Sequence, residues 1–294
     1  MARSAVFGWL ALGLLACQPE TPSGAERSSG ITPLDHLPAL RGDYFAFDSR
    51  AVGRGFHVYV RFPEGYDPQG EIDYPVVYLL DGDSLFPILA PQHLFLTYDD
   101  GLPEAIVVGI AYGSFEAPIN RRGFDYSPAA AEGEPDRGGA PAFHDFLANE
   151  LVPTIESRYR ADPARRILFG QSRGGGFVLY SAFVAPDLFW GRIASNPAFE
   201  PGRELYFATE PTARPIASRD DLSLIVTSGS RDRPAFRQAA LDWFEAWRTV
   251  EDPPWAIELM TLSGGTHAAD SSRSYRSGLR WLFGWQPEAG PPDG

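Results

Sequence analysis

A serine flanked by glycines stands where a nucleophile could be held. Ser172 is the centre of Gly170-Gln171-Ser172-Arg173-Gly174, which directly follows a short apolar run and directly precedes a helical one. A sharp strand-to-helix turn needs small residues two positions before and after the serine. The next helix would aim its unpaired amides and its positive dipole end at negative charge near the serine oxygen. The pattern predicts a nucleophile, and its alternative is a glycine-rich turn without chemistry.

A serine hydroxyl becomes nucleophilic when a histidine accepts its proton, and the chain has five histidines. We expect His267 to be this base. It follows the last predicted strand through Ser263-Gly264-Gly265-Thr266, a loop flexible enough to carry an imidazole over the sheet edge. The alternative is a loop histidine without a role. The other histidines lie where a serine, acid, histidine chain order places no base: His36, His57, His93 and His144.

An acid should orient the imidazole, and it should come from the loop that follows the apolar run 222–226. Asp232 ends that loop and is the predicted acid. Its alternative role is to cap a helix that opens near Pro234, because Asp is favoured just before a proline in the first helical turn. Two further alternatives stay open, a Ser-His dyad and one of the fallback acids Asp220, Asp221 and Asp270.

Short β-rich runs alternate with longer amphipathic segments from about residue 57, which predicts an α/β fold with a mostly parallel sheet and helices on both faces. Helical spacing of apolar residues predicts helices over 141–159 and 235–250. Several strand candidates are continuously apolar, as strands covered on both faces should be. The predicted strands are 57–62, 76–80, 105–110, 166–169, 191–194, 222–226 and 256–259.

The first residues predict export and a lipid anchor. Arg3 precedes an apolar run that ends in Leu14-Leu15-Ala16-Cys17, which resembles a bacterial lipobox. We expect residues 1–17 to be a lipoprotein signal peptide with lipidation at Cys17, or else a plain signal peptide.

The rest of the chain is expected to divide into three parts: a flexible tether over 18–39, one catalytic domain over 40–285 and a disordered tail over 286–294. A surface loop is expected over 127–139. The protein would lie in the bacterial cell envelope, on the periplasmic or outer-membrane side, or be secreted.

Charge and cysteine content exclude several kinds of binding partner and structural bond. The net charge of -13 and the pI near 4.8 argue against binding of nucleic acid, which needs clustered cations that outweigh the acids. Cys17 is the one cysteine, so no internal disulfide and no thiolate metal cluster can form. The lipid anchor would be the sole membrane contact.

Further segments resemble a known family: Tyr74–Gly82, Arg121–Pro128, Gly138–Gly139 and Phe146–Tyr159, followed by the serine turn. Over about residues 40–284 the chain is similar to the putative esterases, a group of α/β-hydrolases with esterase D, feruloyl esterase, ferric-siderophore esterase and mycolyltransferase relatives. The resemblance implies a triad of Ser172, Asp232 and His267, and an oxyanion hole at Gly82, Asp83 and Arg173. It also implies neither a metal nor a cofactor. One departure is Ser195–Phe199, where many relatives carry a Ser-Pro pair followed by aromatic residues.

Arginines near the predicted site suggest an anionic ester. Arg121 and Arg122 are predicted substrate-binding residues, because guanidinium groups pair with carboxylates or ferric catecholates. Phe199 is a predicted substrate contact as a candidate for the wall of an apolar pocket. Alternatively, these arginines pair with their own neighbours, such as Arg122 with Asp125 or Asp136. Further arginines flank the predicted serine and acid, and further aromatic residues are candidates for an apolar pocket: Arg173, Arg231, Arg233, Phe86 and Phe236.

The predicted activity is hydrolysis of a small-molecule carboxylic ester through an acyl-enzyme, with siderophore-like esters as one candidate. An acyltransferase would use the same residues, with an alcohol or amine in place of water. A surface binding protein that kept the scaffold is the alternative of a different class. The oligomeric state stays open.

Overall fold

The computed structural model describes residues 32–34, 37–128, 137–200, 202–208 and 219–284. Cys17 and the predicted signal peptide and tail lie outside these ranges, as does most of the loop expected at 127–139. Within the described part of the chain, no helix has the length and apolar character needed to cross a bilayer. No group of three His, Cys, Asp or Glu side chains placed to hold a metal ion occurs in these ranges.

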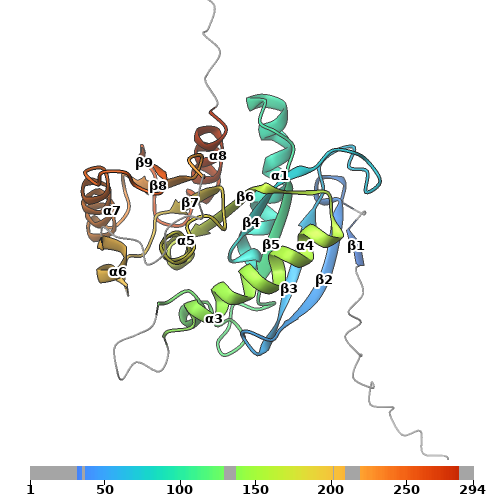
Figure 1. Cartoon of the computed structure of the whole chain (residues 1–294), viewed down its shortest axis with the longest axis horizontal. Helices are drawn as coiled ribbons and strands as arrows, with labels where there is room; N and C mark the ends of the chain where they lie inside the picture. The colour runs from blue at the N-terminus through green and yellow to red at the C-terminus, as the bar shows by residue number, and fades with distance from the viewer. Residues whose placement is uncertain (1–31, 35–36, 129–136, 201, 209–218, 285–294) are drawn as a thin grey trace, which may run out of the picture.

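Nine strands of the described chain form one sheet in the order β1-β2-β3-β5-β4-β6-β7-β8-β9 (Figure 1). Neighbouring strands from β5 to β9 pair in parallel, whereas β1, β2 and β3 join the sheet through antiparallel pairs. The strands are β1 (Thr32–Leu34), β2 (Gly42–Ser49), β3 (Arg54–Arg61), β4 (Tyr74–Leu79), β5 (Ile106–Ala111), β6 (Ala161–Gln171), β7 (Gly191–Ser195), β8 (Ser223–Gly229) and β9 (Ala256–Leu262). The mostly parallel sheet and all seven predicted strands are confirmed.

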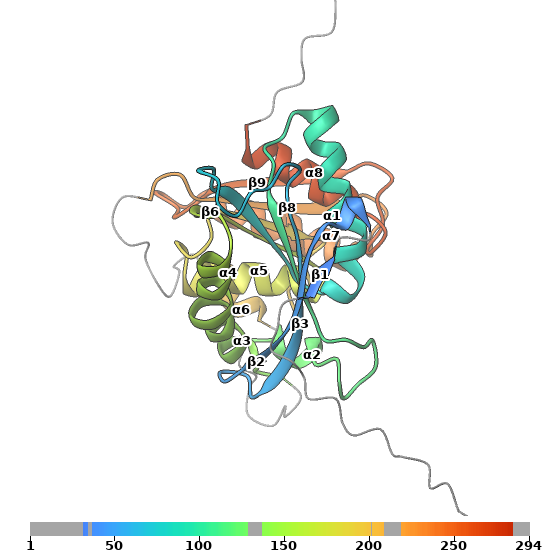
Figure 2. The same ribbon diagram turned by 90° about the vertical axis from the view of Figure 1, so that its right-hand side faces the viewer.

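Helices cover both faces of this sheet, as predicted. Alternate residues of β4 show the two layers, because Val76 and Tyr78 pack into one buried cluster while Val77 and Leu79 pack into another. Figure 2 shows α3, α4 and α5 on one side of strand β3 and α1 on the other. The helical elements are η1 (Pro38–Leu40), α1 (Gly82–Asp100), α2 (Arg122–Asp125), α3 (Ala140–Asp145), the π-helix η2 (Phe146–Leu151), α4 (Val152–Arg158), α5 (Arg173–Val184), α6 (Arg203–Phe207), α7 (Pro234–Trp247) and α8 (Ser271–Leu282).

The sheet begins earlier than the sequence indicated. Thr32–Leu34 pairs with Gly42–Tyr44 as an edge strand, and Pro38–Leu40 forms a short helix. The predicted tether over 18–39 is therefore wrong in its last part. Strand β1 is only three residues long, too short for an alternating pattern to reveal it.

Candidate active site

Ser172 lies at the turn between β6 and α5 with φ 57° and ψ -114°, a backbone conformation that residues other than glycine rarely adopt. The Ser172 amide donates to the Ser195 carbonyl at 2.9 Å, and the Ser172 carbonyl accepts from the Ala198 amide at 2.9 Å. A Cβ at Gly170 would lie 2.3 Å from the Gly174 carbonyl oxygen. The predicted need for a small residue two positions before the serine follows from this close approach of two backbone segments.

A chain of hydrogen bonds joins the three residues of the predicted triad. Ser172 Oγ lies 2.8 Å from His267 Nε2, and His267 Nδ1 lies 2.8 Å from Asp232 Oδ2. The Asp232 side chain is fully buried, while the His267 side chain is 26% exposed. This arrangement lets the imidazole exchange a proton with the serine while the carboxylate holds its far side.

The alternatives for the acid fit the structure less well. The residue that caps α7 is Arg233, and the cap has no side-chain hydrogen bond. Asp232 Oδ1 instead accepts from the neighbouring Arg233 amide at 2.6 Å. Asp220 and Asp221 precede β8, at the opposite end of the strand from His267, and Asp270 pairs with Arg273 at 3.3 Å.

Hydrogen bonds donated by backbone amides fasten the loop that carries the acid, here named the acid loop (229–233), to the loop that carries the histidine, here named the histidine loop (263–267). The Arg231 amide donates to the Gly265 carbonyl at 2.7 Å, and the Gly264 amide donates to Ser230 Oγ at 2.8 Å. A Cβ at Gly229 would lie 2.6 Å from the Gly265 carbonyl carbon. The glycines thus allow the two loops to pack directly on each other.

Two positioning residues escaped the sequence reasoning. Gln171 Nε2 donates to the His267 carbonyl at 2.8 Å, so the residue before the nucleophile holds the histidine loop. The buried Asn196 accepts from the Gly229 amide at 2.7 Å through Oδ1, and so holds the start of the acid loop. Their positions in the sequence could have pointed to them. Gln171 is next to the predicted serine, and Asn196 lies in the segment Ser195–Phe199, which departs from the pattern of the relatives. Phe236, expected in a pocket, packs edge-on against the His267 ring with centroids 4.7 Å apart.

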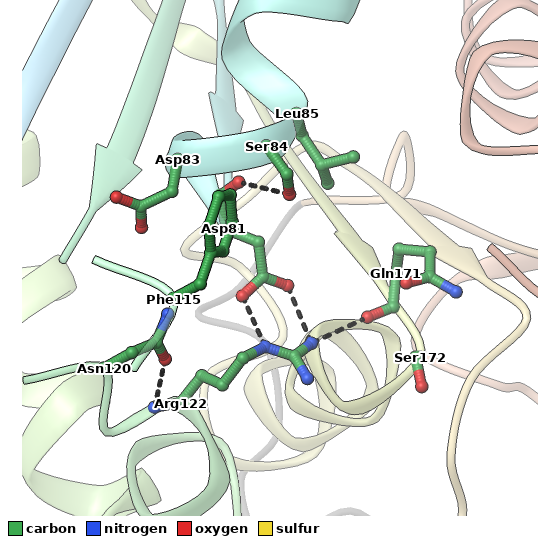
Figure 3. A pocket seen from close by; sticks show the side chains of 9 residues that line it. All are labelled: Asp81, Asp83, Ser84, Leu85, Phe115, Asn120, Arg122, Gln171 and Ser172. Carbon is green, nitrogen blue, oxygen red and sulfur yellow. Dashed lines mark hydrogen bonds and ion pairs between the residues drawn. The ribbon is translucent and has the colours of Figure 1, made fainter. Parts of the chain in front are cut away.

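A cavity of about 250 Å³ opens beside Ser172 (Figure 3). It lies between the start of α1, the chain that follows β5, and the serine turn. Phe115 forms an apolar part of its wall and is 75% exposed. The residues around it are Asp81, Asp83, Ser84, Leu85, Phe115, Asn120, Arg122, Gln171 and Ser172. The cavity can hold part of a small ligand next to the serine hydroxyl.

Arg122 and Asp81 form a two-pronged ion pair on the cavity wall (Figure 3). The two bonds measure 2.6 Å and 2.8 Å, and Arg122 Nη2 also reaches the Gln171 carbonyl at 3.4 Å. Burial lowers the pKa of Arg122, but the hydrogen bonds and charge of Asp81 raise it more, so the pKa lies above its ordinary value. Arg122 therefore pairs within the protein, although not with the predicted Asp125. That carboxylate pairs with Arg54, and Asp136 lies outside the described residues.

The predicted oxyanion-hole residues lie at the ends of adjacent strands. Gly82 begins α1 after β4, and Arg173 begins α5 after β6, which pairs with β4 in parallel. The carboxylate of Asp83 accepts from the amides of Tyr112 and Gly113 at 2.8 Å and 2.7 Å, so this side chain fastens α1 to the chain that follows β5. Both helices thus direct their N-terminal amides toward the same edge of the sheet, where they can stabilise an oxyanion.

The other predicted substrate contacts do not line the cavity beside Ser172. Phe199 is only 3% exposed and packs against Tyr206 and Phe207, so it belongs to the core and not to a pocket wall. Phe86 is likewise 3% exposed. The Arg121 guanidinium lies over the Phe124 ring, 5.1 Å from its centroid.

The other described histidines lie away from the serine. Burial lowers the pKa of His93 to about 4, and its ring bonds Tyr275 and the Pro103 carbonyl. His57 Nδ1 lies 2.7 Å from Tyr44 Oη, on strands β3 and β2. These histidines fill structural roles, which agrees with the choice of His267.

Residues 49–283 match the model of the family described as "Putative esterase". The chain belongs to the putative esterase family. It is thereby a member of a family of carboxylic-ester hydrolases, and the resemblance noted in the sequence is confirmed. The match includes every residue of the site described above.

Three curated relatives of this esterase carry esterase names. The ferri-bacillibactin esterase BesA of Bacillus subtilis is 32% identical over 51% of this chain and 56% of its own length, so the matched part spans little more than half of that relative. The siderophore triacetylfusarinine C esterase of Aspergillus fumigatus is 27% identical over 73% of this chain and 78% of its own. The apo-salmochelin esterase of Escherichia coli is 27% identical over 73% of this chain and 70% of its own.

Solved structures share the fold of this esterase. The siderophore hydrolase EstB from Aspergillus nidulans superposes with a TM-score of 0.72 at 23% identity, over 85% of this chain and 96% of that one. The enterobactin and salmochelin hydrolase IroE superposes with a TM-score of 0.64 at 24% identity, over 82% and 94%. These likenesses establish the α/β-hydrolase fold.

Proposed function

We propose that this esterase cleaves carboxylic esters through an acyl-enzyme formed on Ser172. The observation that carries the proposal is the unbroken hydrogen-bond chain from buried Asp232 through His267 to the Ser172 hydroxyl, at the mouth of a cavity. A scaffold that served only for binding would have no need to keep these three groups in register at 2.8 Å.

The proposed reaction has two halves. Ser172 Oγ attacks the ester carbonyl carbon while His267 Nε2 takes the hydroxyl proton. The carbonyl oxygen becomes negative and accepts from the amides of Arg173 and Gly82. The carbon–oxygen bond to the alcohol then breaks, and His267 donates its proton to that oxygen. A water molecule attacks the acyl-enzyme with His267 again as base, which releases the acid and restores Ser172. Asp232 accepts a hydrogen bond from the Nδ1–H of His267 throughout.

For the substrate, we propose an ester of the siderophore type or another ester that carries negative charge. Support comes from the names of three relatives, each called an esterase of a siderophore. Arginines near the serine give further support, because their charge contrasts with the net charge of -13 for the whole chain.

We also propose that Cys17 is lipidated and that the protein is held in the bacterial cell envelope. The support is the sequence Leu14-Leu15-Ala16-Cys17 after an apolar run. Labelling of growing cells with an azide-bearing fatty acid should mark the protein, and Cys17→Ser should remove the label. A label that survives in Cys17→Ser would contradict the anchor.

The test of the catalytic proposal is hydrolysis of 4-nitrophenyl butyrate, together with mass-spectrometric mapping of an organophosphonate adduct. Ser172→Ala should lose at least about a thousandfold in kcat/KM, because the nucleophile is gone. The adduct should lie on Ser172 in the wild type. A wild-type rate no higher than that of Ser172→Ala, with Ser172 unlabelled, would leave the binding-protein alternative.

A further inference from the structure

Arg173 differs from the other arginines near the nucleophile in the partners it has. Arg122 is neutralised by Asp81, and Arg121 lies over an aromatic ring. The Arg173 side chain is exposed, and among the described residues it has neither an ion pair nor a hydrogen bond nor an aromatic ring under its guanidinium. None of the described acidic side chains therefore neutralises its charge.

The surroundings of Arg173 make an unpaired cation unfavourable there. Burial lowers the pKa of Arg173, and the charges of Arg122 and Arg137 lower it further. Like charges repel each other, so an anion paired with the Arg173 guanidinium would offset this repulsion. In a chain with 38 acidic and 25 basic residues, it is notable that none of the described carboxylates pairs with Arg173.

The direction of the Arg173 side chain shows where a ligand could meet its guanidinium. Arg173 leaves the chain one residue after the nucleophile, and its Nη1 reaches α2, where a Cβ built on Gly123 would lie 4.0 Å away. No side chain at position 123 covers the guanidinium. Neither Arg173 nor Gly123 is among the residues around the cavity beside Ser172. Arg122, the chain neighbour of Gly123, does line that cavity, so the Arg173 guanidinium lies beside the α2 edge of the cavity wall.

We propose that the Arg173 guanidinium determines specificity by pairing with an oxyanion on the part of the substrate that projects from the cavity toward α2. This inference rests on the proposed ester hydrolysis at Ser172. A guanidinium binds a carboxylate through two parallel charged hydrogen bonds, so substrates with a carboxylate or a similar oxyanion at this reach are favoured over neutral esters of the same size.

The test compares anionic esters with matched neutral ones. The first pair is mono-4-nitrophenyl glutarate and 4-nitrophenyl pentanoate, with the charge on the acyl side. The second pair is 3-carboxyphenyl butyrate and phenyl butyrate, with the charge on the alcohol side. The readout is the ratio of kcat/KM for the anionic ester to that for the neutral ester, because an effect through the Arg173 amide is common to both esters and cancels.

Arg173→Gln should lower this ratio at least about tenfold for one of the two pairs, since it removes a charged hydrogen-bond partner. The ratio in Arg173→Lys should lie between that of the wild type and that of Arg173→Gln. Arg248→Gln removes an equal charge at the far end of α7, where Arg248 pairs with Glu245, and should keep the ratio within about twofold. A ratio in Arg173→Gln within about twofold of wild type for both pairs overturns the proposal.

Position 123 gives an independent test that leaves Arg173 in place. Gly123→Asp puts a carboxylate beside the guanidinium and should lower the ratio, whereas Gly123→Asn has the same size without the charge and should not. An equal ratio in these two variants overturns the proposal, because the charge of Arg173 would then have no influence.

A binding measurement separates this inference from the proposed function. Ser172→Ala, with and without Arg173→Gln, is titrated calorimetrically with both anionic esters. Affinity for one of them should fall at least about tenfold when Arg173 is replaced. Equal affinity overturns the role of Arg173, whether or not the wild type turns over. Loss of turnover in the wild type would instead contradict the acyl-enzyme proposal.

Discussion

The two sides of Ser172 are built by different means. On the side of β8 and β9, the acid loop and the histidine loop are joined by backbone hydrogen bonds and by the contact of Gly229 with Gly265. On the side of α1 and α2, the wall of the cavity is held by side chains, chiefly the ion pair of Asp81 with Arg122. Proton transfer needs fixed distances, and here backbone contacts provide them together with bonds to the side chains of Gln171 and Asn196.

The contrast indicates where the molecule tolerates change. Side chains such as Arg122 and Phe115 can be replaced without altering the path of the strands. A change at Gly229 alters the distance between two loops. We therefore expect substitutions on the β8–β9 side to reduce turnover and those on the α1–α2 side to affect mainly stability and substrate choice. Three substitutions test this comparison.

Asp232→Asn should have the largest effect on the β8–β9 side. It preserves shape but removes the acceptor that fixes the His267 tautomer, so kcat should fall about a hundredfold to ten thousandfold. The measurement is kcat on 4-nitrophenyl butyrate. Asp270→Asn is the control and should change kcat less than about tenfold, because Asp270 pairs with Arg273. A loss below about tenfold in Asp232→Asn would indicate a Ser-His dyad.

Gly229→Ala should have an intermediate effect. The added Cβ would lie 2.6 Å from the Gly265 carbonyl carbon and must push the histidine loop away. We expect kcat to fall about tenfold to a hundredfold, since displacement by about 1 Å costs about that much. Gly53→Ala is the control, because its Cβ meets nothing within 4 Å while its φ of 73° costs about 1 kcal/mol of stability. If Gly229→Ala kept wild-type kcat, the backbone contact would not position the histidine.

Asp81→Asn should have the smallest effect on turnover and act on stability. Asparagine accepts the left-handed conformation of Asp81, at φ 55°, so the change isolates the charge. Arg122 would lose its partner, and we expect the free energy of unfolding in urea to fall by about 1–3 kcal/mol. The control Asp221→Asn removes an exposed ion pair with Arg219 and should cost under about 1 kcal/mol. A kcat loss as large as that of Gly229→Ala would mean that both sides position the chemistry.

Much of the site could be predicted because its parts follow strand ends. Ser172, Asp232 and His267 come after β6, β8 and β9, and apolar runs of that kind are visible in the sequence. The parallel order of those strands brings their ends to one edge. No distance had to be known to expect the three residues there.

Other parts could not be predicted, for physical reasons. Helix α1 contains Pro87 and Pro91, and it also exposes Ile88 and Phe95, so it has no clean apolar stripe. The partner of Arg122 is 41 positions away in the chain, whereas sequence reasoning looks first at neighbours such as Asp125. Phe199 was expected at a substrate pocket, but its ring packs in the core against Tyr206 and Phe207.

The conformation of Ser172 has a consequence for how this chain could evolve. A residue with a side chain at φ 57° and ψ -114° costs on the order of 1–3 kcal/mol relative to a relaxed backbone, and glycine would relieve much of that cost. Selection for heat resistance alone would therefore favour loss of the serine. Under the proposed mechanism, the serine at this position serves turnover at a cost to the stability of the fold.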